Sequence, residues 1–303
     1  MQMDRNISER NPQIPNVLLL GNGINRAFGA SSWDDIINNL STGEFDSSPE
    51  FAEAIRKLPN SLQTVVISSD SVHDGMKQVS GELMPKVLDK DHRDLLRNCC
   101  NLGFDAILTT NYSYEVETAL LPDFKLKQEK VCRYRKNTMM GSKPQEQFGI
   151  FKYFDINGKQ IWHIHGEAAK PKSMVLGHYY YGKLLSEIQN RVPQFIRSYK
   201  AALAKGNNVT YRSWIDYFLV GNIYVIGLSL DPSEMDLWWL INCKKRNFEG
   251  CGKIYLYEPN MDDDNHIALR MLADTFDLVY ENHSVKTGEY KDYFESVISS
   301  INL

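Results

Sequence analysis

Short apolar runs that end in a glycine or a polar turn recur along the 303-residue chain. Continuous apolar runs of this length are typical of strands buried in a parallel sheet. We predict such strands at residues 16–20, 104–108, 223–226, 253–257 and 277–280. Because helical patterns follow several of them, the chain is expected to form βαβ units with right-handed crossovers. The predicted fold class is therefore α/β, with a Rossmann-like, doubly wound parallel sheet.

Two stretches do not fit the spacing of simple βαβ units. Residues from 46 to about 100 and from 178 to about 220 have helical patterns and little strand signal, so we expect helical insertions there. Between them, alternating residues flank Asn157-Gly158 and predict a hairpin over 150–164, since Asn-Gly favours a type I′ turn. We expect a single domain over residues 1–303, a length that can bury a full core.

Composition excludes several classes of protein. Hydrophobic residues make up 43% of the chain and charged residues 24%, so it is not of the disordered class. The net charge of −4 gives no basic field of the kind that draws proteins onto nucleic acid. The 5 cysteines include no pair at the spacing of a zinc knuckle. A polar N-terminus and the lack of a membrane-length apolar stretch lead us to expect a cytoplasmic protein with a soluble substrate.

The strand ends carry the unusual residues, and ligands of doubly wound sheets bind beyond the carboxyl ends of strands. Gly21-Asn22-Gly23 follows the first strand, where backbone N–H groups can hold a pyrophosphate. A tight turn that needs glycine only for its backbone angles is the alternative. Arg26 stands where the dinucleotide fingerprint has its third glycine, which disfavours an ordinary dehydrogenase site.

Three further strand ends carry polar side chains. Asn111 follows the second strand and offers a donor and an acceptor for a ribose hydroxyl or a water, unless it only caps a helix beginning at Tyr112. Ser229 and Glu258 follow the later strands, and Glu258 is placed like the acidic residue that binds an adenosine ribose in dinucleotide folds. Loop capping is the alternative for both.

Two histidines lie two residues apart. His163 and His165 are expected to project from the same face of a strand, with Gly166 allowing a close approach beside them. Histidine is the usual general base, but a hydrogen-bonded core side chain is the alternative. We expect no metal, because Glu167 and His178 are the only further ligand types nearby.

The order of the motifs is more informative than any one of them. Gly-Asn-Gly-Ile-Asn (21–25), Thr-Thr-Asn-Tyr (109–112), His-Ile-His-Gly (163–166) and Gly-Leu-Ser-Leu (227–230) together resemble the sirtuin-like domain of bacterial anti-phage proteins. Ser32-Trp33 and residues 175–185 extend the resemblance. It implies NAD as substrate and no metal. By matching positions it implies catalytic roles for Asn111 and His165, and NAD contacts for Gly21, Gly23 and Ser229. We also predict NAD contacts for Asn22, Asn25 and Thr110, which lie in the same motifs, and for Glu258.

The chain departs from the family deacylases because it lacks their four-cysteine zinc ribbon. The resemblance then implies an NAD hydrolase, an effector that depletes NAD during infection. NAD-dependent deacylation or ADP-ribosyl transfer, and a non-catalytic nucleotide-binding sensor or assembly subunit, are the alternatives. Ser113 stands where many relatives have an aspartate, with Glu115 as a candidate substitute. NADP as substrate and a cyclic product remain open.

Unrestrained NAD hydrolysis would kill the host, so the resemblance also implies restraint. We expect a separately encoded sensor or regulatory protein, with homo- or hetero-oligomerisation as the switch. Neither a membrane nor a nucleic acid is an expected partner.

Overall fold

In the computed structural model, which describes residues 14–32, 35, 49–67, 83, 87–126, 132–134, 148–286 and 288–303, the strands of these segments form one eight-stranded sheet. The strands in spatial order are β3 (Cys132–Tyr134), β4 (Lys152–Ile156), β5 (Lys159–His163), β2 (Ala106–Thr109), β1 (Asn16–Leu20), β6 (Asn222–Ile226), β7 (Ile254–Tyr257) and β8 (Val279–Tyr280). In this order, all neighbouring pairs from β5 to β8 are parallel, whereas β3 with β4 and β4 with β5 pair antiparallel.

The parallel strands have the order of a Rossmann sheet. Numbered along the chain as 1 (β1), 2 (β2), 3 (β5), 4 (β6), 5 (β7) and 6 (β8), they lie in the order 3-2-1-4-5-6. The chain therefore crosses from one half of the sheet to the other between β5 and β6, and the switch point lies between β1 and β6. The predicted α/β, Rossmann-like fold class is confirmed.

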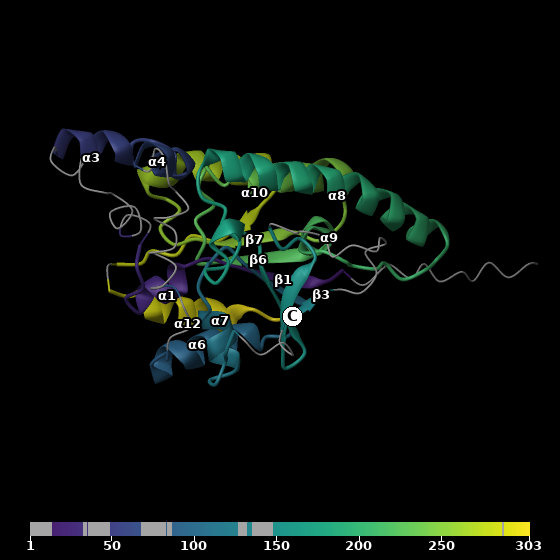
Figure 1. The fold of residues 1–303 in the computed structure, drawn as a ribbon, viewed down its shortest axis with the longest axis horizontal. Helices are drawn as coiled ribbons and strands as arrows, with labels where there is room; N and C mark the ends of the chain where they lie inside the picture. Colours follow the sequence, from purple (N-terminus) through teal and green to yellow (C-terminus); the bar gives the residue numbers. More distant parts are fainter. Residues whose placement is uncertain are drawn as a thin grey trace, which may run out of the picture.

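Helices cover both faces of the sheet, with α8 and α10 on one side and α6, α7 and α12 on the other (Figure 1). Alternate residues of β1 enter the two cores: Val17 and Leu19 pack with α8 to α11, and Leu18 and Leu20 with α1, α6, α7 and α12. The helices are α1 (Gly23–Ala27), α3 (Pro49–Arg56), α4 (Asn60–Ile67), α6 (Lys90–Cys100), α7 (Glu115–Leu120), α8 (His178–Ala204), α9 (Trp214–Val220), α10 (Met235–Asn247), α11 (Ile267–Thr275) and α12 (Tyr290–Ser300).

Charged side chains from two other helices fix both ends of α9. At its N-terminal end, the buried Asp216 carboxylate accepts hydrogen bonds from the Arg191 guanidinium of α8. At its C-terminal end, Lys244 of α10 donates to the carbonyls of Leu219 and Gly221 at 3.1 and 2.8 Å. The Lys244 bonds satisfy carbonyls that a helix end leaves unpaired, and together the two sets of bonds join α9 to α8 and α10.

The predicted hairpin is confirmed. Asn157 and Gly158 both have positive φ, at 52° and 81°, as a type I′ turn requires, and they join β4 to β5. The strand β3, which pairs with β4, was not predicted from the sequence. No helix in the described part of the chain is both long and apolar enough to cross a membrane.

The two stretches expected to be helical insertions hold α3, α4 and α6 in the first, and α8 and α9 in the second. Part of the first stretch, including residues 68–82, lies outside the described residues, as does Trp33. The division of residues 1–303 into a single domain with two insertions stays a prediction.

Candidate functional site

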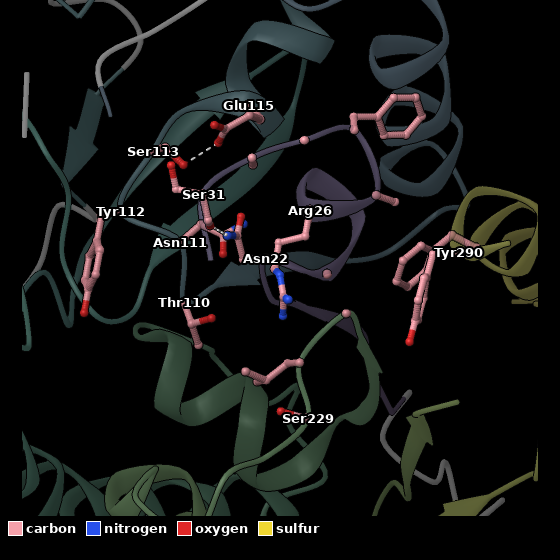
Figure 2. Close-up of a pocket in the computed structure, with 18 of the residues that line it drawn as sticks. Asn22, Arg26, Ser31, Thr110, Asn111, Tyr112, Ser113, Glu115, Ser229 and Tyr290 are labelled. Carbon is pink, nitrogen blue, oxygen red and sulfur yellow. Dashed lines mark hydrogen bonds between the residues drawn. The ribbon is translucent and has the colours of Figure 1, made fainter. Parts of the chain in front are cut away.

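A cavity of about 920 Å³ opens at the carboxyl ends of the parallel strands, at the switch point between β1 and β6. A volume of this size is at the upper end of the range for ligand sites and suits a molecule as large as a dinucleotide. Residues that follow β1, β2, β5, β6 and β7 all contribute to its wall, and Figure 2 shows several of those after β1, β2 and β6. Of the residues predicted from the sequence, those that line the cavity are Asn22, Gly23, Thr110, Asn111, His165, Ser229 and Glu258.

The glycine loop after β1 is joined to the loop after β6. Gly21 N–H donates to the Ile226 carbonyl at 3.0 Å, and Gly23 N–H donates to the Gly227 carbonyl at 2.8 Å. A Cβ atom at Gly21 would lie 2.3 Å from the Gly227 oxygen, so the close approach of the two loops requires glycine. Since these two N–H groups already have protein partners, a role of Gly21 and Gly23 in phosphate binding stays a prediction.

Asn25 supports the loop from beneath. Its buried side chain donates to Asn22 Oδ1 at 3.0 Å, and its own Oδ1 lies 2.9 Å from His92 Nε2 on α6. Asn22 in turn donates to the Ser31 carbonyl at 3.0 Å. The structure thus places Asn22 in the wall of the cavity, with Asn25 behind it as a link to α6.

Asn111 is held at three points. Its backbone N–H donates to Thr109 Oγ1 at 3.1 Å, its carbonyl lies 2.7 Å from His163 Nδ1, and its side-chain Nδ2 donates to the Gly21 carbonyl at 3.2 Å. The alternative in which Asn111 caps the next helix is wrong, because α7 begins at Glu115. Among the described residues the side-chain Oδ1 has no partner, so it is available to a ligand in the cavity.

His163 and His165 do not project from the same face, contrary to the prediction. His163 packs against Tyr114 and Phe154 on the α7 side of the sheet, whereas His165 packs against Tyr181 of α8 on the other side. The physical reason is that β5 ends at His163, so the turn that follows breaks the two-residue alternation of a strand. The two imidazoles therefore have separate environments.

His163 has a structural environment. Its Nε2 lies 2.8 Å from Glu117 Oε1, and its Nδ1 faces the Asn111 carbonyl. Burial lowers the pKa of His163, but the Glu117 carboxylate and these hydrogen bonds outweigh it and raise the pKa above its ordinary value. With two acceptors beside it, the ring is held as an imidazolium and has no lone pair for base catalysis.

His165 lies in the wall of the cavity but is only 2% exposed. Its Nε2 is 3.0 Å from Asp236 Oδ2 and 3.7 Å from Glu234 Oε2. Burial lowers the pKa of His165, but the carboxylates of Asp236 and Glu234 outweigh it and raise the pKa to about 9. One ligand-type atom from each of these three side chains lies within 4.8 Å of the other two. Glu234 and Asp236 come from a distant part of the sequence, so residue spacing around His165 did not indicate them.

Three further predicted residues reach the cavity from separate strands. Thr110, after β2, and Ser229, after β6, both line it (Figure 2). Glu258 lies beyond β7, and burial raises the pKa of its carboxyl to about 7. His266 Nε2 lies 3.5 Å from Glu258 Oε1.

Ser113 and Glu115 both line the cavity beside Asn111, and the Ser113 hydroxyl donates to the Glu115 carboxylate. Burial raises the pKa of Glu115. A carboxyl group is therefore present in the cavity wall beside Ser113, supplied by Glu115, as the sequence suggests.

Sequence reasoning did not assign Arg26, Glu234 or Asp236 to the site. Arg26 is exposed and is the only lysine or arginine among the described residues that line the cavity, and Figure 2 shows its guanidinium projecting into it. The signal for Asp236 is an acidic residue within the apolar run Met235 to Leu240, where a core-facing position of α10 would otherwise be apolar.

The fold and the cavity define a Rossmann-like domain with a dinucleotide-sized site at its switch point. The family model described as the SIR2-like domain matches residues 105–210, the part of the chain that carries Thr110, Asn111 and His165. This match confirms the predicted sirtuin-like resemblance and supports an NAD-related function. No curated protein matches the chain.

Proposed function

We propose that this protein hydrolyses NAD to nicotinamide and ADP-ribose. The observation that carries the proposal is the convergence of Asn111 and His165, from two different strands, on one dinucleotide-sized cavity. Ser229 and Glu258 reach the same cavity from the other half of the sheet. The SIR2-like match supports NAD as the molecule that spans them.

In this reaction the bond between the ribose C1′ atom and the nicotinamide nitrogen breaks, and its electron pair neutralises the pyridinium charge. A water oxygen forms the new bond to C1′ and loses one proton. Asn111, held at three points with its Oδ1 available, orients the water or a ribose hydroxyl. His165 accepts the proton or holds the hydroxyl.

Water is the proposed acceptor because the chain has no peptide-binding cysteine ribbon. The cysteines at 99 and 100 are buried side by side in the core, and those at 243 and 251 lie in and beyond α10. None of these four cysteines is among the described residues that line the cavity. This arrangement favours hydrolysis over deacylation of a bound peptide.

The proposal includes restraint of the resting protein. We propose that a separately encoded partner that senses infection, or assembly into an oligomer, releases NAD hydrolysis, and that NAD depletion in the cytoplasm is the defence output. Measuring the oligomeric state and the NAD turnover of the chain, with and without its genomic neighbour, tests this part. Full turnover by the isolated chain, unaffected by the neighbour, would show the regulatory idea to be wrong.

The catalytic proposal is tested by incubating the chain and its genomic neighbour with NAD and following nicotinamide and ADP-ribose. We expect equal release of the two products and a loss of about 100-fold or more in Asn111→Ala and His165→Ala. Asn207→Ala, at an exposed residue beyond α8, is the matched control and should keep wild-type activity. Wild-type activity in both site variants would remove the assignment, and a mass increase on a protein would instead support ADP-ribosyl transfer.

A further inference from the structure

His165 has two carboxylates beside one ring nitrogen, although a single acceptor would satisfy the hydrogen bond of a core histidine. Asp236 and Glu234 approach the same ring nitrogen, Nε2, from the start of α10. Asp236 is fully buried, and its second oxygen, Oδ1, has no hydrogen-bond partner among the described residues. Burying an ion without full hydrogen bonding is costly, so this carboxylate is retained at an energetic disadvantage.

Because an ionised carboxylate can only accept hydrogen bonds, the contact with Asp236 requires a proton on His165 Nε2. The other ring nitrogen, Nδ1, has no hydrogen-bond partner among the residues that the structure describes. His165 lies in the wall of the cavity, so Nδ1 is the atom available there for exchange of a proton with a ligand or water. A carboxylate that fixes the tautomer of a histidine in this way makes its second nitrogen a base.

We infer that Asp236 is the positioning residue of the site: it holds His165 with the proton on Nε2, so that Nδ1 accepts the proton of the attacking water. This inference rests on the proposed function. When the water oxygen bonds to C1′, its proton moves to Nδ1 and the ring becomes an imidazolium. The carboxylates of Asp236 and Glu234 stabilise that positive charge and the positive charge that develops on the ribose.

Other groups also face this pair. Tyr181 of α8 stacks edge-on against His165 and donates its hydroxyl to Glu234 Oε2 at 3.0 Å. Tyr112, beyond β2, donates its hydroxyl to the Val175 carbonyl. Burial and the Asp236 charge raise the pKa of Glu234 to about 6, and His165 opposes the rise. The tyrosines stay neutral near pH 7, so the two carboxylates dominate the titration of His165.

The rate of NAD hydrolysis should depend on the ionisation of His165. Only neutral His165 can accept a proton, and its pKa is raised to about 9, so kcat should rise with pH up to about 9. In Asp236→Asn the attraction for the imidazolium is lost, so the pKa falls and the rising limb should move at least about one pH unit lower. The plateau rate should fall about 100-fold or more, because an amide can stabilise the wrong tautomer.

The first measurement is independent of NAD turnover. The imidazole resonances of His165 in the full-length chain are titrated by NMR in wild type, Asp236→Asn and Asp274→Asn, the last at an exposed residue of α11. Of these three proteins, only Asp236→Asn should show a lower His165 pKa. Glu234→Gln, titrated in the same way, should show a smaller decrease. An unchanged pKa in Asp236→Asn would overturn the inference whatever the substrate is.

The second measurement is the pH profile of nicotinamide release by the same variants together with Asp236→Glu. We expect the shifted limb and the low plateau in Asp236→Asn, with partial rescue by glutamate and a wild-type profile in Asp274→Asn. A wild-type pH profile in Asp236→Asn would also overturn the inference. Absence of any NAD turnover by the wild type would sink the proposed function, while the NMR titration would still decide whether Asp236 sets the state of His165.

Discussion

His163 Nδ1 lies 2.7 Å from the backbone carbonyl of Asn111, and this bond joins the end of β5 to the loop after β2. The same ring faces Glu117 Oε1 at 2.8 Å, so a buried imidazolium bridges a carboxylate and the carbonyl of the proposed catalytic asparagine. A histidine outside the cavity wall thus fixes a residue within it.

We predict that His163→Gln destabilises the fold by about 2–4 kcal/mol, because it leaves the Glu117 carboxylate buried without its cationic partner. Nicotinamide release should fall about tenfold as the Asn111 loop loosens. Denaturant unfolding and a turnover assay measure the two effects.

In the double variant with Glu117→Gln the loss of stability should be smaller than the sum of the two single losses. Additive losses would contradict the interaction between His163 and Glu117. His283→Ala is the control for replacing a histidine elsewhere in the protein.

Arg26 is predicted to bind the pyrophosphate of NAD. Since it is the only lysine or arginine in the described wall of the cavity, Arg26→Ala should raise KM for NAD about 10- to 100-fold with little change in kcat. Arg26→Lys should recover part of the loss, and calorimetric binding of ADP-ribose should follow the same order. Arg197→Ala, on an exposed face of α8, is the control. An unchanged KM in Arg26→Ala would place the phosphates elsewhere.

We predict that Glu258 makes NAD binding dependent on pH. Its carboxyl pKa is raised to about 7 by burial, and only the ionised form accepts hydrogen bonds from both hydroxyls of a ribose. The affinity for NAD should therefore increase as the pH rises through about 7, and Glu258→Gln should bind weakly with no such increase. Titrations at several pH values measure this, with His266→Gln to remove the second titratable group nearby. An affinity that does not change with pH in the wild type would argue against the ribose contact.

Two glycine substitutions should have opposite effects on stability. Gly21→Ala places a Cβ atom 2.3 Å from the Gly227 oxygen, so the loops after β1 and β6 must separate and the protein should lose about 2 kcal/mol or more. Gly182→Ala, at an exposed position of α8 with open space around it, should stabilise the fold by about 0.5–1 kcal/mol. Thermal and denaturant unfolding compare them, and equal stabilities would refute the close packing of the loops.

The central strands β1, β2 and β6 were predictable because each is a continuous apolar run that is almost entirely buried. The expected strand at 16–20 matches β1, and the later runs match β6 and β7 to within one residue. The general location of the site followed as well, since parallel strands end at one edge and the polar residues follow those ends.

Side-chain directions and distant partners were not predictable. His165 and Asp236 are 71 residues apart, and no local pattern indicates that α10 delivers a carboxylate to the end of β5. Strand alternation predicted one face for His163 and His165, but it could not indicate that the strand stops at the first of them. β3 is short and pairs at the sheet edge, so too few residues carry its pattern.

The contact between Gly21, Gly23 and Gly227 consists of main-chain atoms alone. The spacing of the loops after β1 and β6 is therefore set by glycine at these three positions, and no side chain takes part in the hydrogen bonds of this contact. In the proposed NAD site, discrimination among related nucleotides would then depend on other residues of the wall, such as Arg26 and Glu258.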